Sequence, residues 1–85
     1  MIIKTKYEIG QHIWVVYENQ GEVCVYDDYI GWITYEEYLY YTTKQSCADR
    51  REEEIIKFED TDGLVNRIKE LTQEIRERER SENNK

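Results

Sequence analysis

The candidates for chemistry in this sequence are one histidine, two cysteines and the adjacent carboxylates Asp27–Asp28 and Glu36–Glu37. A nucleophile such as Cys24 needs a base within hydrogen-bond reach, and His12 is the one imidazole of the chain. Both residues lie in runs of β-branched and aromatic side chains, where histidine and cysteine are usually ordinary strand residues. We find no nucleotide-binding or hydrolase motif, and we expect a protein that is not an enzyme.

The carboxylate pairs Asp27–Asp28 and Glu36–Glu37 could hold a metal ion or act as acid and base. Successive side chains of a strand point to opposite faces, so each pair is split if it lies in a strand. Cys24 and Cys47 lack CxxC spacing, and a single histidine does not complete a zinc site with them. We therefore expect no metal and no cofactor, and whether the two cysteines pair stays open.

The charge of the chain is concentrated in its first part. The 85 residues carry a net charge of −7, with −5 in residues 1–43, −2 in residues 44–60 and 0 in residues 61–85. An acidic surface repels phosphates, so we expect no direct nucleic-acid binding. It would attract a basic protein surface, although carboxylates also serve simply to keep a small domain soluble.

The length allows a single domain with one modest core. No segment approaches the ~20 apolar residues that span a bilayer, and the first residues have no apolar run of signal-peptide length. We expect a soluble cytoplasmic protein that does not bind membranes, with one domain over residues 1–80 and a frayed tail at residues 81–85.

The elements that must position the polar groups are short strands followed by one helix. Asn19-Gln20-Gly21 predicts a tight hairpin turn, and Gly31 predicts a bulge or bend that lets a small sheet curl. Residues 44–51 are polar and predict a loop. The fold class is α+β, a small antiparallel five-stranded β-barrel or curled sheet followed by one C-terminal helix. Runs of β-branched and aromatic residues predict its strands at residues 12–18, 22–28, 29–35, 37–43 and 53–58.

The C-terminal segment changes to a helical period and carries one apolar stripe. Thr61 or Asp62 can cap its first turn. As a lid, the stripe closes one face of the sheet; as an interface, it packs against a second copy, so monomer and homodimer both stay open. The stripe consists of Leu64, Ile68, Leu71 and Ile75.

Tyrosines and carboxylates interleave near the ends of the predicted middle strands. Tyrosine supplies rigid contact area, and carboxylates steer a basic partner and pair with its Arg or Lys side chains. Some of these tyrosines can instead fill the core with their hydroxyls outward, and an aromatic cage for a methylated lysine is a third interpretation. The candidate partner-binding residues are Asp27, Asp28, Tyr29, Tyr35, Glu36, Glu37, Tyr38 and Tyr40.

Several segments resemble small phage and mobile-element proteins. The resemblance rests on Lys6–Val16 (KYEIGQHIWVV), on Ile30–Ile33 (IGWI), on Tyr38 and on Phe58–Thr61 (FEDT) leading into a helix. Those proteins are typically SH3-like barrels that end in a strand and a helix, and they have no shared catalytic residues to carry over. The longer 44–51 loop and the Arg/Glu-rich tail depart from that pattern and leave the number of strands open.

The resemblance also implies a kind of function. Small acidic phage-type proteins often inhibit host defence complexes, among them anti-CRISPR proteins that occupy basic nucleic-acid channels. Together with the charge map, this predicts a phage-encoded inhibitor that binds a basic surface of a nucleic-acid-binding, CRISPR-type effector and mimics phosphates. Two alternatives stay open: an oligomeric sponge for a small nucleotide signal, and a structural domain that self-assembles. The scarcity of basic residues on the strands counts against the sponge.

Overall fold

A long β-hairpin forms the centre of the molecule. The computed structural model describes residues 5–83, without the side chains of residues 82 and 83. Strand β1 (His12–Asn19) and strand β2 (Glu22–Tyr35) pair in antiparallel fashion around the predicted turn, where Gln20 and Gly21 have φ angles of 53° and 82°. Both angles are positive, as a two-residue hairpin turn requires, and glycine adopts them without steric cost.

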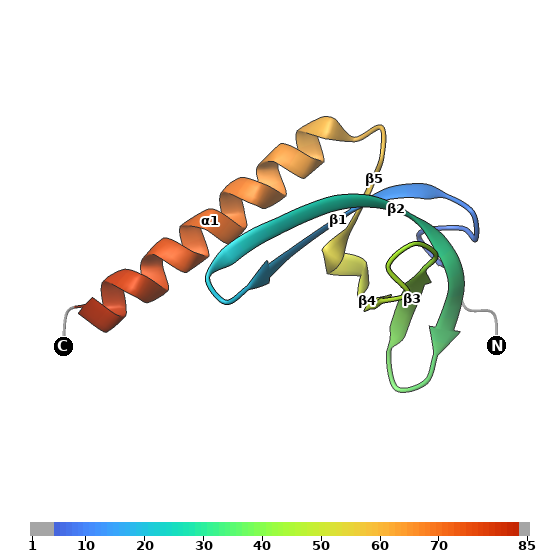
Figure 1. Ribbon diagram of the computed structural model, residues 1–85, viewed down its shortest axis with the longest axis horizontal. Coiled ribbons are helices and arrows are strands. Elements are labelled where there is room, and N and C mark those ends of the chain that lie inside the picture. The colour runs from blue at the N-terminus through green and yellow to red at the C-terminus, as the bar shows by residue number, and fades with distance from the viewer. Residues whose placement is uncertain (1–4, 84–85) are drawn as a thin grey trace.

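The other elements complete one antiparallel sheet and one helix (Figure 1). The sheet has the strand order β4-β3-β2-β1-β5. In the sequence, a 3-10 turn, η1 (Glu52–Glu54), connects the two short strands that form the opposite edges of the sheet. The remaining elements are β3 (Leu39–Thr43), β4 (Asp49–Arg50), β5 (Ile55–Lys57) and α1 (Thr61–Asn83). The prediction of an α+β domain with five antiparallel strands before one helix is confirmed.

Strand β2 is continuous over 14 residues, so the two strands predicted at 22–28 and 29–35 are one. Its first half pairs with β1 and its second half with β3, and the register shifts between Ile30 and Trp32. A Cβ atom at Gly31 would lie 2.9 Å from the carbonyl oxygen of Thr42, which explains glycine at the bend. The predicted bulge is confirmed, and Figure 1 shows β2 arching across the molecule.

The sheet curls without closing into a barrel. After β3 the chain forms β4 and then η1, which contacts β1, β3 and β5. The two edge strands, β4 and β5, do not pair with each other, so the ladder is not closed. The strands predicted at 37–43 and 53–58 are shorter, at 39–43 and 55–57, and β4 lies inside the predicted 44–51 loop. Of the two predicted architectures, the curled sheet is therefore the correct one.

Strand β1 is covered on both faces, by the main core on one side and by α1 on the other. Ile13 and Val15 point into the main core, which also holds Tyr7, Ile30, Tyr41 and Ile55. Val16 is fully buried and points the opposite way, toward the face over which α1 lies (Figure 1). A strand covered on both sides needs apolar residues at adjacent positions, as in Val15–Val16.

Helix α1 is capped by the residue before the two predicted ones. The side chain of Asp60 accepts a hydrogen bond from the backbone N–H of Gly63 at 3.0 Å, so Asp60 is the cap and not Thr61 or Asp62. The helix continues to Asn83 and so includes residues 81–83 of the predicted tail; residues 84–85 lie outside the described part. In residues 5–83 no helix has both the length and the apolar character needed to cross a membrane.

Two tyrosines lie at the centre of the main core. The rings of Tyr7 and Tyr41 meet edge to face at 5.4 Å between centroids. The Tyr7 hydroxyl donates to the carbonyl oxygen of Ile55 at 2.8 Å, and the Tyr41 hydroxyl donates to Glu52 at 2.8 Å. Burial, followed by the nearby Glu52 carboxylate, raises the pKa of each phenol to about 12.

Candidate functional site

The predicted partner-binding residues fall into three separate groups in the structure. Asp28 is fully buried, whereas its neighbours Asp27 and Tyr29 point to the face of the sheet on which His12 of β1 lies. The other predicted residues belong to the β2–β3 hairpin: Tyr35, Glu36, Glu37, Tyr38 and Tyr40. The expected single cluster is thus divided, because side chains alternate between the two faces of β2 and because this strand of 14 residues separates Asp27 and Tyr29 from the hairpin.

Asp28 is a structural residue and does not face a partner, which corrects its place among the candidates. Its carboxylate accepts hydrogen bonds from the backbone N–H groups of Tyr29, Gln45 and Ser46 and from the Ser46 hydroxyl, at 2.7 to 3.0 Å. Burial alone would raise the pKa of this carboxyl, but the hydrogen bonds outweigh burial and lower it. Asp28 therefore anchors the loop after β3 to the middle of β2.

The hairpin residues line a groove whose volume is about 240 Å³. We call it the acidic tyrosine groove, and it is lined by Glu36, Tyr38, Tyr40, Asp49, Arg51 and Glu54. Strand pairing brings these residues together, because Thr42 of β3 lies opposite Asp49 of β4 and donates to its carboxylate at 2.7 Å. Three carboxylates and one guanidinium give the groove a net charge of −2. Tyr35 and Glu37 are exposed on the same hairpin but do not line it.

The tyrosine rings of the groove offer an aromatic surface to a cation. Tyr38 is 50% exposed, and its ring lies 5.8 Å from that of Tyr40 at an interplanar angle of 52°. The guanidinium carbon of Arg51 lies 4.5 Å from the centroid of the Tyr38 ring, within the range of a cation–π contact. The groove thus combines aromatic faces with carboxylates, the two kinds of group that bind Arg and Lys side chains.

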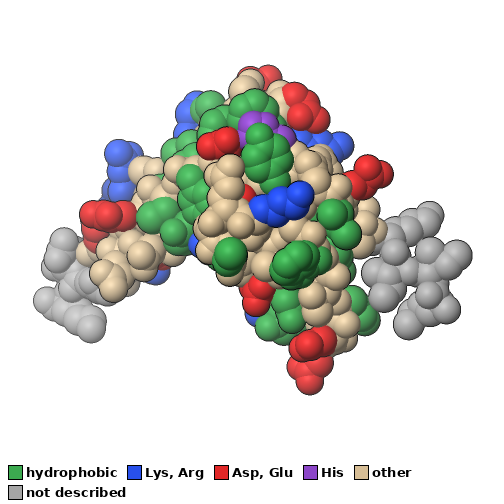
Figure 2. All heavy atoms as spheres, turned by 45° about the vertical axis from the view of Figure 1, so that its right-hand side comes forward, with side chains coloured by type: hydrophobic (Ala, Val, Ile, Leu, Met, Phe, Trp, Pro, Cys, Tyr) green, Lys and Arg blue, Asp and Glu red, His purple; other side chains and the backbone are tan. Residues whose placement is uncertain are grey.

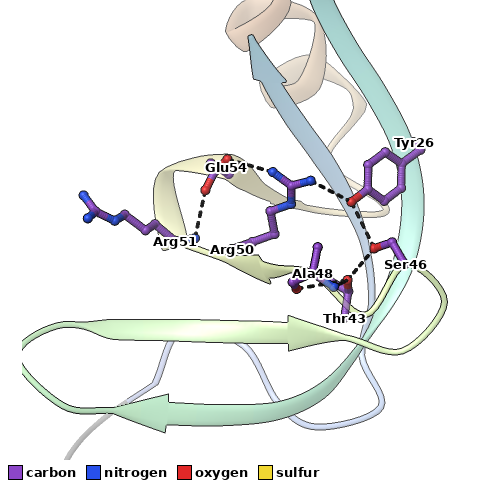
Figure 3. A network of polar contacts seen from close by, with 7 residues as sticks. All are labelled: Tyr26, Thr43, Ser46, Ala48, Arg50, Arg51 and Glu54. Atoms are coloured by element: carbon purple, nitrogen blue, oxygen red, sulfur yellow. Dashed lines mark hydrogen bonds and ion pairs between the residues drawn. The ribbon is translucent and has the colours of Figure 1, made fainter. Parts of the chain in front are cut away.

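A partly buried polar network adjoins the groove at Glu54 (Figure 3). The Arg50 guanidinium stacks on Tyr17 at 4.0 Å and donates to Glu54 at 3.2 Å and to the Tyr26 hydroxyl at 3.3 Å. Tyr26 continues the network to Ser46, whose hydroxyl also lies 2.7 Å from that of Thr43. Arg50 therefore holds the Glu54 side chain in place at the groove. Because Arg50 and Ser46 lie in a segment predicted to be a loop, no local pattern pointed to them.

A second surface, the aromatic row, lies where His12 stacks between Tyr29 and Phe58, with ring centroids 4.5 and 3.7 Å away. Phe58 in turn stacks on Trp14 at 4.9 Å, and His12 pairs with Asp27 at 2.8 Å. Figure 2 shows the histidine among hydrophobic side chains on this face. The spacing of His12 and Trp14 in a strand places them on one face, but Phe58 joins them only through tertiary structure.

The nucleophile and base considered in the sequence do not meet. Cys24 lies opposite Tyr17 in the hairpin register and therefore points to the face opposite His12. Cys24 and Cys47 are both free thiols. Among the residues that the structure describes, no group of three or more His, Cys, Asp or Glu side chains is arranged to hold a metal ion. Comparison with protein-family models, curated proteins and solved structures finds no match to this chain.

Proposed function

We propose that this protein is a non-enzymatic cytoplasmic binding protein that docks its acidic tyrosine groove and the β2–β3 hairpin on a basic protein surface. The proposed partner is a nucleic-acid-binding effector of the CRISPR type, and the proposed effect is that nucleic acid can no longer enter its basic channel. One observation carries the proposal: tyrosine rings and three carboxylates meet in one exposed groove.

The distribution of charge supports this choice of surface. Residues 22–54 contain nine acidic and three basic residues, a net charge of −6 out of −7 for the whole chain. Within it, residues 35–54, from the end of β2 through η1, contain six acidic and three basic residues, so a net charge of −3 lies in the segment that forms the groove. Complementary potentials accelerate association and disfavour partners of like charge, and a row of carboxylates can take the places that phosphates occupy in a basic channel.

The helix supports a monomeric binding protein rather than a self-assembling one. Leu71 and Ile75 of the apolar stripe are 6% and 8% exposed within a single chain, and α1 contacts β1 and β2. Arg78 near the end of α1 forms an ion pair with Glu18 near the end of β1. Two of the four stripe residues are thus covered by the chain's own sheet, which leaves less apolar area for a second copy.

The test is affinity capture from a bacterial lysate with a matched pair of charge-reversal variants. In Glu36→Lys/Glu37→Lys the hairpin loses its acidic character, whereas Glu74→Lys/Glu79→Lys makes the same change in net charge on the exposed face of α1. Captured proteins are identified by mass spectrometry at low and high salt, and the captured effector is then assayed for binding of its nucleic acid.

We expect the wild type and the helix variant to retain a nucleic-acid-binding protein that is released at high salt. The hairpin variant should lose it while its circular dichroism spectrum and melting temperature stay close to those of the wild type. Equal capture by both variants would contradict the assignment of the hairpin. A captured effector that still binds its nucleic acid would contradict the proposed blocking.

A further inference from the structure

We infer that the acidic tyrosine groove is a guanidinium site, which Arg51 occupies in the free protein and an arginine of the partner occupies in the complex. This inference rests on the proposed function and adds to it the chemistry of the recognised side chain. It also assigns Arg51 a role of its own, as an internal ligand that the partner must displace.

The position of Arg51 carries the inference. Its guanidinium carbon lies 4.5 Å from the Tyr38 ring centroid, in a groove that also contains Glu36 and Asp49. Among the side chains that the structure describes, no carboxylate oxygen lies within 4.0 Å of its guanidinium nitrogens. The residue is exposed, so solvent can receive the side chain when it leaves the ring.

The neighbouring residue Arg50 shows the contrast between a structural and a displaceable guanidinium. The side chain of Arg50 is 17% exposed and is held by Tyr17, Tyr26 and Glu54 at once. Within residues 5–81, the guanidinium of Arg51 forms no ion pair and lies over the face of Tyr38. Alternate residues of an extended segment point to opposite sides, which directs one guanidinium into the fold and the other into the groove.

The chemistry of the groove favours arginine over lysine. A guanidinium is planar and weakly hydrated, stacks on an aromatic face and can donate to two carboxylates at its edges, whereas an ammonium is a compact, strongly hydrated charge. The rings of Tyr38 and Tyr40 supply the faces, and Glu36 and Asp49 supply acceptors at the rim. When Arg51 leaves, the net charge of the groove changes from −2 to −3, which strengthens its attraction for the incoming arginine.

The test measures binding of a fluorescein-labelled peptide of alternating arginine and serine, and of its lysine counterpart, by fluorescence anisotropy at low salt. Arg51→Ala empties the groove, and Arg76→Ala makes the same change in net charge on the exposed face of α1. We expect Arg51→Ala to bind the arginine peptide about two- to fivefold more tightly than Arg76→Ala does, since it no longer loses its own cation–π contact. The gain with the lysine peptide should be smaller.

Each other outcome has a defined meaning. If Arg51→Ala binds the arginine peptide no more tightly than Arg76→Ala does, the displacement of Arg51 is overturned. The proposed function still stands in that case if the wild type binds the peptide and Glu36→Lys/Glu37→Lys does not. An equal gain with the lysine peptide overturns the choice of guanidinium. No binding of either peptide to any variant overturns the guanidinium site, and the lysate capture described above then decides the proposed function separately. If Arg51→Ala melts well below the wild type, Arg51→Lys replaces it, because lysine keeps the charge but loses the stacking.

Discussion

The carboxylate of Asp28 accepts hydrogen bonds from both the backbone N–H and the hydroxyl of Ser46, at 3.0 and 2.9 Å, across 18 residues of sequence. The same Ser46 hydroxyl lies 3.1 Å from the hydroxyl of Tyr26, which receives a hydrogen bond from Arg50. One buried carboxylate thereby connects the middle of β2, the loop after β3 and the support of the acidic tyrosine groove. The consequences for stability can be measured.

We expect Asp28→Asn to reduce the free energy of unfolding at neutral pH by about 1–3 kcal/mol, because the amide nitrogen cannot accept the hydrogen bonds that the carboxylate accepts. The folded-state pKa of Asp28 lies below its unfolded value, so its stabilisation is present above about pH 4 and is lost as the pH falls through the folded pKa. Urea unfolding across this acid range should therefore show a steeper loss for the wild type than for Asp28→Asn. Equal slopes would show that the carboxylate is not stabilised in the fold.

The core tyrosines predict an alkaline transition. The folded-state pKa values of Tyr7 and Tyr41 are about 12, above the unfolded value of about 10. Their contribution to stability is therefore complete below about pH 10 and is lost as the pH rises toward the folded values. We expect phenolate absorbance to show a late-titrating fraction that coincides with unfolding. Tyr41→Phe should weaken this alkaline loss, while Tyr35→Phe, at an exposed ring, should leave it unchanged.

Leu71 tests the role of the helix as a cover of the sheet. We expect Leu71→Ala to lower the free energy of unfolding by about 2–5 kcal/mol, as for other buried leucines. Val65 lies on the same helix but is 48% exposed, so Val65→Ala should change stability by less than about 0.5 kcal/mol. Thermal unfolding of both variants gives the comparison. If Leu71→Asp abolished an oligomer and left the monomer folded, the stripe would be an interface and not a cover.

Gly31 tests the bend of β2. A methyl group there would approach the Thr42 carbonyl oxygen to 2.9 Å, so β2 and β3 would have to separate. We expect Gly31→Ala to cost about 1–3 kcal/mol, the usual range for an added group in a packed region. Glu22→Ala, at the exposed start of β2, should lower the free energy of unfolding far less. Chemical denaturation distinguishes the two, and an unaffected Gly31→Ala would show that the strands yield at the bulge.

Local patterns predicted the parts of the fold that depend on neighbours in sequence. The turn at Gln20–Gly21, the bend at Gly31 and the period of α1 follow from backbone preferences and from periodicity, which act over a few residues. For the same reason Glu36, Tyr38 and Tyr40 were found as candidates: they lie within one hairpin and reach the groove together. Asp28 was misplaced because a carboxylate pair signals a strand end or an exposed edge, and the donors that bury it lie in another segment.

The sequence by itself determined the α+β class, the acidic surface and the hairpin that carries the tyrosines, since composition and short-range spacing suffice for these. Tertiary structure alone decided that the sheet stays open, that Asp49, Arg51 and Glu54 join the hairpin tyrosines in a groove, and that Phe58 stacks on His12. Each of these depends on pairing between residues distant in sequence. Such pairing is set by the packing of whole faces against each other, and no local pattern along the chain encodes it.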